Sequence, residues 1–218
     1  MGNIEDLNYY IDNLDICDNI VVSNYKSVKA IKGNDFFIDS IGDYLFRVSY
    51  NSFFQVNKSG VKLLYDKVAE YAGLTKKENV LDLYCGTGTI GIYLSKNAKK
   101  VIGVEINQNA VNDANYNKEL NNIDNIEFIC KDVSLIKEKY KNIDLVVVDP
   151  PRSGLKGESI YNVLDINPKK IIYVSCDPIT LARDLKILKN KYNVKDVTLV
   201  DMFPNTYHVE CICLLMRK

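Results

Sequence analysis

The sequence predicts an α/β fold in which a mostly parallel, seven-stranded sheet is covered by helices and ends in an antiparallel hairpin. Three observations support this prediction. From residue 79 onward, runs rich in Val, Ile and Leu alternate with segments of helical periodicity, which is typical of βαβ units. The runs are apolar almost throughout, as strands buried on both faces should be. The last two runs are too close together to hold a helix, so they must form an antiparallel pair.

The first 50 residues differ from the rest of the chain. Strand-like stretches at residues 20–28 and 35–48, with glycine turn signals beside them, predict a small β-rich segment. We therefore divide the chain into this N-terminal β-rich segment, residues 1–50, and a second domain, residues 51–218, that contains the sheet.

The second domain begins with a helix and continues with alternating strands and helices. Residues 61–74 have helical periodicity and follow the segment NSFFQVN. Five strands are predicted at residues 79–85, 100–106, 126–132, 143–149 and 170–176, with helices at residues 91–98, 108–122 and 178–192. The closing hairpin is predicted from residues 194–203 and 209–218.

Composition restricts the class of protein. The 218 residues are 47% hydrophobic and 26% charged, which excludes a disordered chain, a collagen and a disulfide miniprotein. Residues 1–57 carry a net charge of −4 and the remainder +4, so the total is zero and argues against bulk phosphate binding. No apolar run reaches the roughly 20 residues of a membrane span, and no signal peptide is recognisable. We expect a cytoplasmic monomer that contacts no membrane.

A glycine loop follows the first strand of the predicted sheet. Gly86, Gly88 and Gly91 have the spacing G-x-G-x-x-G between a strand and a helix. Glu105 ends the next strand, where a carboxylate that binds a ribose would lie. This pattern alone is compatible with a dinucleotide or with S-adenosylmethionine. Asp82 favours S-adenosylmethionine, because a carboxylate attracts a cationic cofactor and repels the pyrophosphate of a dinucleotide.

Two further strands end in groups of chemical interest. Asp149 ends the fourth strand in VVVDPPRSG and Cys176 ends the fifth in YVSCDP, so both should lie at the same edge as the glycine loop. Because Pro178 then opens a helix, we expect the helix N-terminus to lower the pKa of the Cys176 thiol. The six cysteines do not have the spacing of a metal site, and none is expected. Core filling is the interpretation for Cys85, Cys130, Cys211 and Cys213.

A thiolate at this edge is suited to methylation of a pyrimidine carbon. Carbon 5 of uracil is a poor nucleophile until a thiolate adds to carbon 6 and gives an enolate. A base must then remove the proton from carbon 5, and His208 and Glu210 are both candidates by type. Methylation of an adenine amino group is disfavoured, because Arg152 stands where enzymes of that class carry an aromatic residue.

Five motifs, FFQVN, DLYCGTG, DPPRSG, YVSCDPITLARD and DMFPNTYHVE, follow one another from about residue 45 to the end. Together they resemble the RNA uracil-5-methyltransferases, which have a Rossmann-like class I methyltransferase fold and use S-adenosyl-L-methionine. The resemblance implies that Cys176 is the nucleophile and Glu210 the base. It further implies cofactor binding by Gln55, Tyr84, Glu105 and Asp149, and a substrate contact by Phe53. From their places in the sequence, we add Gly86 of the glycine loop as a cofactor contact and Arg152, near the same edge, as a candidate to hold a substrate phosphate.

The resemblance also implies an RNA partner. The expected target is a uridine of 23S rRNA, with transfer RNA as the other candidate. Family members commonly carry an N-terminal RNA-binding barrel and a four-cysteine iron–sulfur cluster, whereas only Cys17 precedes the catalytic domain here. We therefore expect a shortened relative without these parts. Two alternatives remain open: a non-catalytic fragment that binds the cofactor or RNA, and an NAD-dependent oxidoreductase.

Overall fold

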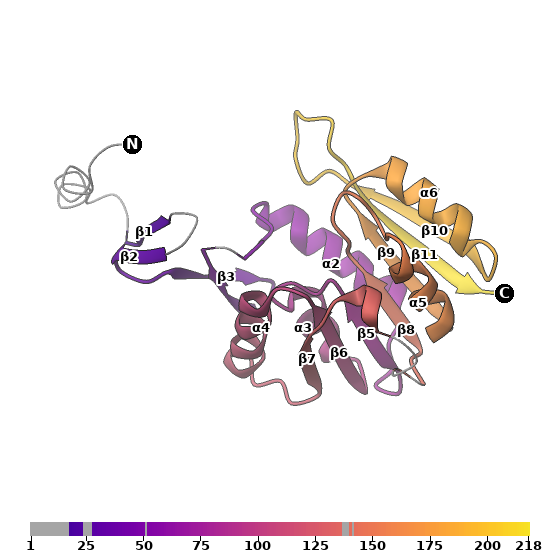
Figure 1. Cartoon of the computed structure of the whole chain (residues 1–218), viewed down its shortest axis with the longest axis horizontal. Coiled ribbons are helices and arrows are strands. Elements are labelled where there is room, and N and C mark those ends of the chain that lie inside the picture. Colours follow the sequence, from indigo (N-terminus) through magenta and orange to yellow (C-terminus); the bar gives the residue numbers. More distant parts are fainter. Residues whose placement is uncertain (1–17, 24–27, 51, 137–139, 141) are drawn as a thin grey trace.

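A computed structural model describes residues 18–23, 28–50, 52–136, 140 and 142–218 of the chain, and Cys17 lies outside these residues. Its centre is a seven-stranded sheet with the order β10-β11-β9-β8-β5-β6-β7 (Figure 1). The five parallel strands are β5 (Asn79–Leu83), β6 (Lys100–Glu105), β7 (Ile126–Cys130), β8 (Leu145–Val148) and β9 (Lys170–Ser175).

The last two strands close the sheet in the manner that the sequence predicts. β10 (Tyr192–Val200) and β11 (Glu210–Arg217) are antiparallel to each other. β11 lies between β9 and β10 and is antiparallel to both. The predicted α/β fold with seven strands and a closing hairpin is confirmed.

Helices follow the strands in the chain, and their ends are set by specific residues. They are α2 (Lys58–Ala72), α3 (Thr89–Ser95), α4 (Gln108–Leu120), α5 (Glu158–Ile166) and α6 (Pro178–Leu188), and a 3-10 turn spans Val133–Leu135. The Asn57 side chain caps the start of α2, and the Asp177 side chain caps α6 ahead of Pro178. Helix α5 was not among the predicted helices; it has nine residues and no side-chain cap, so its sequence signal is weak.

Strand side chains alternate between two hydrophobic cores, one on each face of the sheet. In β8, Leu145 and Val147 pack on the side of α2, α3 and α4, and Val146 and Val148 pack on the side of α5 and α6. Burial on both faces explains why the central strands are almost continuous runs of branched aliphatic residues. The two cores hold the carboxyl ends of the parallel strands in a fixed row.

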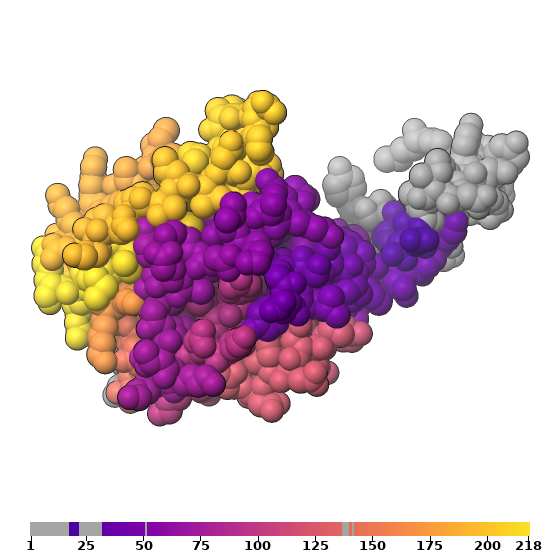
Figure 2. All heavy atoms as spheres, turned by 180° about the vertical axis from the view of Figure 1, so that it is seen from behind, coloured from indigo at the N-terminus to yellow at the C-terminus, as the bar shows by residue number. Residues whose placement is uncertain are grey.

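The described N-terminal residues form two small antiparallel pairs. β1 (Ile20–Ser23) pairs with β2 (Val28–Lys32) and lies away from the seven-stranded sheet (Figure 1). β3 (Phe36–Ile41) and β4 (Tyr44–Ser49) form a hairpin that turns at Gly42, where φ is +58°. The violet surface of this hairpin borders the magenta body of the molecule (Figure 2). Buried Phe46 belongs to the same core as α2 and α3.

Side chains of α4 bind the backbone at the edge of β4. Three polar residues at four-residue intervals, Asp113, Asn117 and Asn121, accept hydrogen bonds from the amides of Ser49, Arg47 and Leu45 at 3.0, 2.6 and 2.9 Å. Both asparagines also donate to the carbonyl of the residue they bind. Four helical residues rise about 6.0 Å and two strand residues about 6.6 Å, so the two repeats match. We call these contacts the amide ladder.

Candidate active site

A pocket of about 550 Å³ opens at the carboxyl ends of the parallel strands. Such an edge is where open α/β sheets bind ligands, and the volume is within the range of small-molecule sites. All nine site residues expected from the sequence line this pocket: Phe53, Gln55, Tyr84, Gly86, Glu105, Asp149, Arg152, Cys176 and Glu210.

Three of these residues come from the ends of neighbouring parallel strands. Leu83 of β5 is in register with the residue before Glu105 in β6 and with the last residue of β8. Tyr84, Glu105 and Asp149 each come one residue later, so they lie side by side across three strands. Tyr84 has a positive φ of 62°, a conformation that strains a bulky residue and often occurs at functional sites.

The glycine loop is fixed to the end of β6 through Glu105. One carboxylate oxygen accepts from the Gly86 amide at 3.1 Å and the other from the Asn107 amide at 2.8 Å. A Cβ atom on Gly86 would meet no atom within 4 Å, so this residue borders open space. A Cβ atom on Gly88 would instead lie 2.5 Å from the Phe128 ring. The absence of a side chain at Gly86 therefore keeps space open in the pocket, whereas at Gly88 it allows the Phe128 ring to pack closely.

The segment before α2 forms another wall of the pocket. Asn57 accepts from the Gly60 amide and donates to the Met202 carbonyl, both at 3.0 Å, which ties this segment to the loop before β11. Gln55 lines the pocket, and its buried Oε1 has no hydrogen-bond partner among the described residues. Phe53, which also lines the pocket, is 74% exposed. An unpartnered buried amide oxygen is costly, which marks Gln55 as a candidate for binding a ligand.

Cys176 and Glu210 meet across the antiparallel pair of β9 and β11. Cys211 is in register with Ser175, so Glu210 and Cys176, one residue further along, lie opposite each other where the pairing ends, and the Glu210 charge acts on the Cys176 thiol. Burial raises the pKa of Glu210, which is 6% exposed, and the Arg152 charge partly offsets this. Burial, together with the charge of Glu210, raises the pKa of Asp149 to about 7. The pocket thus pairs a thiol with carboxyls that hold protons unusually well.

Arg152 is the one cation among the described residues that line the pocket. Its Nη2 atom lies 3.2 Å from Nε2 of His208, which does not line the pocket. The two residues meet at the mouth, where the loop after β8 reaches the loop before β11. His208 therefore contacts Arg152 rather than a ligand in the pocket, and of the two base candidates only Glu210 faces Cys176.

Comparison with known proteins agrees with this geometry. The model of the tRNA (uracil-5-)-methyltransferase family matches residues 21–218. The chain belongs to this family. A protein of Oceanobacillus iheyensis named as an uncharacterized RNA methyltransferase is 44% identical over 88% of the chain, and one of Clostridium acetobutylicum is 49% identical over 82%. The chain covers 43% and 40% of the lengths of these two relatives.

Comparison with solved structures also places the chain with the uracil-5-methyltransferases. The tRNA (uracil-54, C5)-methyltransferase of Pyrococcus abyssi, solved with S-adenosyl-L-homocysteine, is 36% identical with a TM-score of 0.82; the match covers 99% of this chain and 54% of that one. The tRNA m1G37 methyltransferase of Methanocaldococcus jannaschii matches 99% of this chain and 68% of that one with a TM-score of 0.69 at 18% identity, which supports the fold alone. Both comparisons agree with the class I methyltransferase fold.

Three expectations from the sequence are wrong in this family member. The pKa of Cys176 is raised rather than lowered, because burial and the charges of Glu210 and Asp149 outweigh the opposing charge of Arg152. Asp82 does not line the pocket; it is fully buried beneath Gly91, where burial and the Asp149 charge raise its pKa to about 8.

The third correction concerns Cys130, which is exposed at the end of β7 instead of filling the core. Cys85, Cys211 and Cys213 are buried, as expected.

The pocket wall also contains residues that the sequence did not indicate. Tyr65 of α2 lines it, and its hydroxyl lies 2.7 Å from Thr89 Oγ1 beside the glycine loop. No motif marks Tyr65, because its position fits the apolar face of an ordinary helix.

In the described part of the chain, no helix is long and apolar enough to cross a membrane. The same residues contain no group of three or more His, Cys, Asp or Glu side chains that could hold a metal ion.

Proposed function

We propose that this chain methylates carbon 5 of a uridine in RNA with S-adenosyl-L-methionine, and that Cys176 forms a covalent adduct at carbon 6. The observation that carries the proposal is the position of Cys176 opposite Glu210 in the pocket that also holds the glycine loop. A nucleophile and a base in contact with one bound pyrimidine are what this reaction requires. Residues 51–218 would form the catalytic domain, and residues 1–50 the remainder of a β-rich domain.

The pocket fits S-adenosyl-L-methionine better than a dinucleotide. Its lining holds three carboxyl groups, Glu105, Asp149 and Glu210, against the single cation Arg152. This balance favours a sulfonium and an ammonium group and disfavours a pyrophosphate, so we do not propose an NAD-dependent reaction. Gln55, with its unpartnered oxygen, and the open space beside Gly86 would hold the cofactor together with Tyr84. When bound, S-adenosyl-L-methionine supplies an electrophilic methyl group.

Cys176 starts the reaction as a thiolate. The raised pKa of its thiol means that the proton must first leave to water, and Arg152 at the mouth favours the anion. The sulfur then bonds to carbon 6 of uracil, and the electron pair of the 5,6 double bond moves into the enolate. Carbon 5 thereby becomes the nucleophile that takes the methyl group.

Glu210 completes the reaction as the base. Its carboxylate accepts the proton from carbon 5, the double bond re-forms, and the bond between sulfur and carbon 6 breaks. Burial raises the pKa of Glu210, which makes it a stronger base than a solvated carboxylate. Its position on β11 opposite Cys176 sets both groups within reach of one ring.

The substrate base must leave its stack to enter the pocket, because neither carbon is accessible within a helix. Phe53, with 74% of its surface exposed at the mouth, offers a ring against which an unstacked base can lie. The target expected from the sequence is a uridine of 23S rRNA, whereas the similar Pyrococcus abyssi protein is named for uracil 54 of tRNA. Mass mapping of both RNAs from cells with and without the gene would distinguish the two.

The decisive experiment is to trap the adduct. Incubation with S-adenosyl-L-methionine and RNA that contains 5-fluorouridine should give a complex stable to denaturation, because fluorine at carbon 5 cannot leave as a proton. Cys176→Ala should abolish both the complex and methyl transfer, and Cys130→Ala, which changes an exposed cysteine, should leave both unchanged. Adduct formation by Cys176→Ala would contradict the assignment. Cofactor binding without adduct or methyl transfer in the wild type would favour a non-catalytic fragment.

A further inference from the structure

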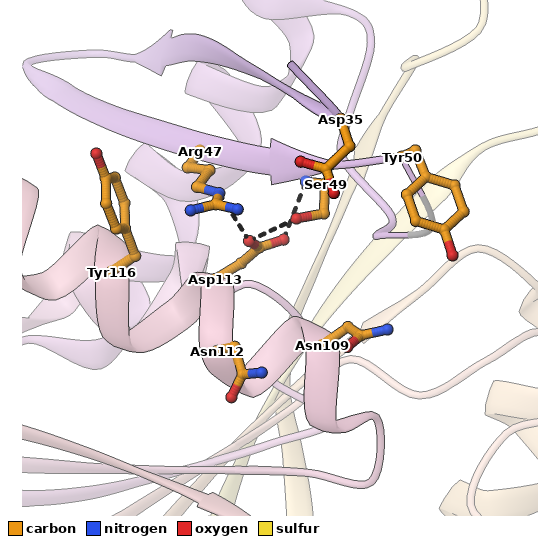
Figure 3. A pocket seen from close by; sticks show the side chains of 8 residues that line it. All are labelled: Asp35, Arg47, Ser49, Tyr50, Asn109, Asn112, Asp113 and Tyr116. Atoms are coloured by element: carbon orange, nitrogen blue, oxygen red, sulfur yellow. Dashed lines mark hydrogen bonds and ion pairs between the residues drawn. The ribbon is translucent and has the colours of Figure 1, made fainter. Parts of the chain in front are cut away.

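A second pocket, of about 250 Å³, lies at the junction between the β3–β4 hairpin and α4 (Figure 3). Its volume is below the roughly 300–1,000 Å³ of sites that enclose a whole small-molecule ligand, so it suits a single ring or group. The reaction proposed above makes no use of it. Its side chains come from segments about 60 residues apart in the chain, which the amide ladder joins.

The charges in this second pocket favour a neutral ligand. Arg47 forms an ion pair with Asp113 at 3.4 Å, and Asp113 also accepts from the Ser49 hydroxyl at 2.8 Å (Figure 3). The Ser52 hydroxyl donates to the same carboxylate at 2.8 Å. Asp35 adds a second carboxylate to the lining. The lining therefore has one cation against two acidic groups, a balance that repels phosphate.

Aromatic and amide groups complete the lining. Tyr116 is 42% exposed and Tyr50 45% exposed, so both rings can take a ligand on one face. The Arg47 guanidinium lies 5.1 Å from the centre of the Tyr116 ring, which fixes that side of the pocket. Asn109 and Asn112 point their exposed side chains from the start of α4 (Figure 3). Flat rings beside amide donors and acceptors are the groups with which proteins recognise unpaired nucleobases.

The second pocket is next to the active site along two segments of chain. Tyr50 precedes Phe53 by three residues, which span at most about 11 Å, and the Ser52 hydroxyl between them bonds to Asp113. On the other side, Asn109 follows Glu105 by four residues, and Glu105 lines the active-site pocket. Short segments of chain therefore join the second pocket to the active site on both sides.

We propose that the second pocket binds the unpaired base of a nucleotide adjacent to the target uridine. The proposal rests on the RNA methyltransferase function proposed above and adds a determinant of its sequence preference. The ring stacks on Tyr116, and the amides of Asn112 and Asn109 bond to its edge. Stacking of this kind contributes about 1–3 kcal/mol per base.

The test measures RNA binding by the full chain and does not depend on turnover. Stem-loops with one loop uridine are prepared with an abasic site at each neighbouring position, and affinity is measured by fluorescence anisotropy with S-adenosyl-L-homocysteine present. For the wild type, one abasic site should weaken binding about 5- to 150-fold. Tyr116→Ala should bind the intact RNA nearly as weakly as the wild type binds the abasic one and should hardly distinguish the two, and Asn112→Ala, which keeps the ring, should lose part of the preference.

Two further variants control for folding and for general surface effects. Tyr116→Phe keeps the ring and should retain the affinity and the preference of the wild type. Tyr161→Ala removes a tyrosine of α5 that is 52% exposed, against 42% for Tyr116, and should change neither. Equal affinities for intact and abasic RNAs in the wild type, or no RNA binding, would overturn the second pocket as a base site. Binding with the expected preference but without methyl transfer would instead contradict the proposed reaction and leave this site standing.

Discussion

Asp113, within α4, and Glu210, at the start of β11, are both buried carboxyls, yet their surroundings are opposite. Asp113, 2% exposed, accepts three hydrogen bonds from Ser49 and Ser52 and pairs with Arg47. Glu210, 6% exposed, has no hydrogen-bonded partner among the described residues, and burial raises its pKa. Burial alone therefore does not decide what a carboxyl does.

The hydrogen-bond donors around each carboxyl explain the difference between Asp113 and Glu210. A carboxylate surrounded by donors is stabilised as an anion and joins the elements that supply those donors. A carboxyl that faces a pocket without donors binds its proton more tightly and can exchange it with a substrate. The junction of β4 with α4 contains the donor-surrounded carboxylate, Asp113, and the active site contains the carboxyl without donors, Glu210. Substitutions at the two sites should therefore affect different properties.

The largest effect is expected at the active site. Glu210→Gln keeps the shape of the side chain but removes the base, so turnover should fall about 10²- to 10⁴-fold and the covalent RNA adduct should accumulate. Thermal stability should not fall, because no hydrogen bond of the described structure is lost. Glu119→Gln, an exposed glutamate of α4, serves as the control. Normal turnover by Glu210→Gln would remove this residue from the mechanism.

At the junction the expected loss is in stability. Asp113→Ala leaves the Ser49 and Ser52 hydroxyls and the Arg47 guanidinium without their partner, which should lower the free energy of unfolding by about 2–3 kcal/mol. This corresponds to a Tm lower by roughly 5–10 °C. Affinity for S-adenosyl-L-homocysteine, measured calorimetrically below the Tm, should stay the same. Unchanged melting would mean that the junction contributes little to stability.

Asp82 offers a test in which pH is varied. Both of its oxygens are buried without a partner, and its pKa is about 8 in the fold against an ordinary 3.8. A raised folded-state pKa gives a contribution that is complete below the ordinary value and is lost as pH rises through 8. Asp82→Asn cannot ionise, so its Tm should exceed that of the wild type at pH 9 and approach it near pH 4. A wild-type Tm advantage at pH 9 would contradict the buried, protonated carboxyl.

The smallest effect concerns the reactivity of the Cys176 thiol. Glu210 is one of the charges that raise its pKa, so Glu210→Gln should lower that pKa and speed alkylation at pH 8 about two- to tenfold. Peptide mass analysis separates Cys176 from exposed Cys130, whose rate should not change. Equal rates at Cys176 in the two proteins would show that the charges are screened from each other.

The local sequence was sufficient to predict the place of a functional side chain where that residue directly follows a strand. Asp149 and Cys176 follow strongly apolar runs, so their place at the edge of a parallel sheet followed from strand length alone. The glycine loop was recognisable for the same reason. Helix α5 was not, because nine residues with a glycine before them carry few of the signals that mark a helix.

The protonation states and the second pocket required the tertiary structure. The lowered pKa expected for Cys176 reversed because the fold buries the thiol and because it brings the carboxyls of Glu210 and Asp149, which are distant in the chain, beside it. Asp113, Asn117 and Asn121 bond to residues 64–76 positions away. Their four-residue spacing was visible as a polar stripe on a helix, but nothing in the sequence named β4 as its partner.

The amide ladder also has a consequence for the order in which the molecule assembles. Its spacing exists only once α4 is helical, so these contacts form after that helix or together with it. The amides of Leu45, Arg47 and Ser49 should then exchange hydrogen whenever the hairpin lifts, while those of Phe46 and Val48, on the side of β3, report on the hairpin itself. The exchange rates of alternate amides in β4 should thus report separately on undocking of the hairpin from α4 and on unfolding of the hairpin itself.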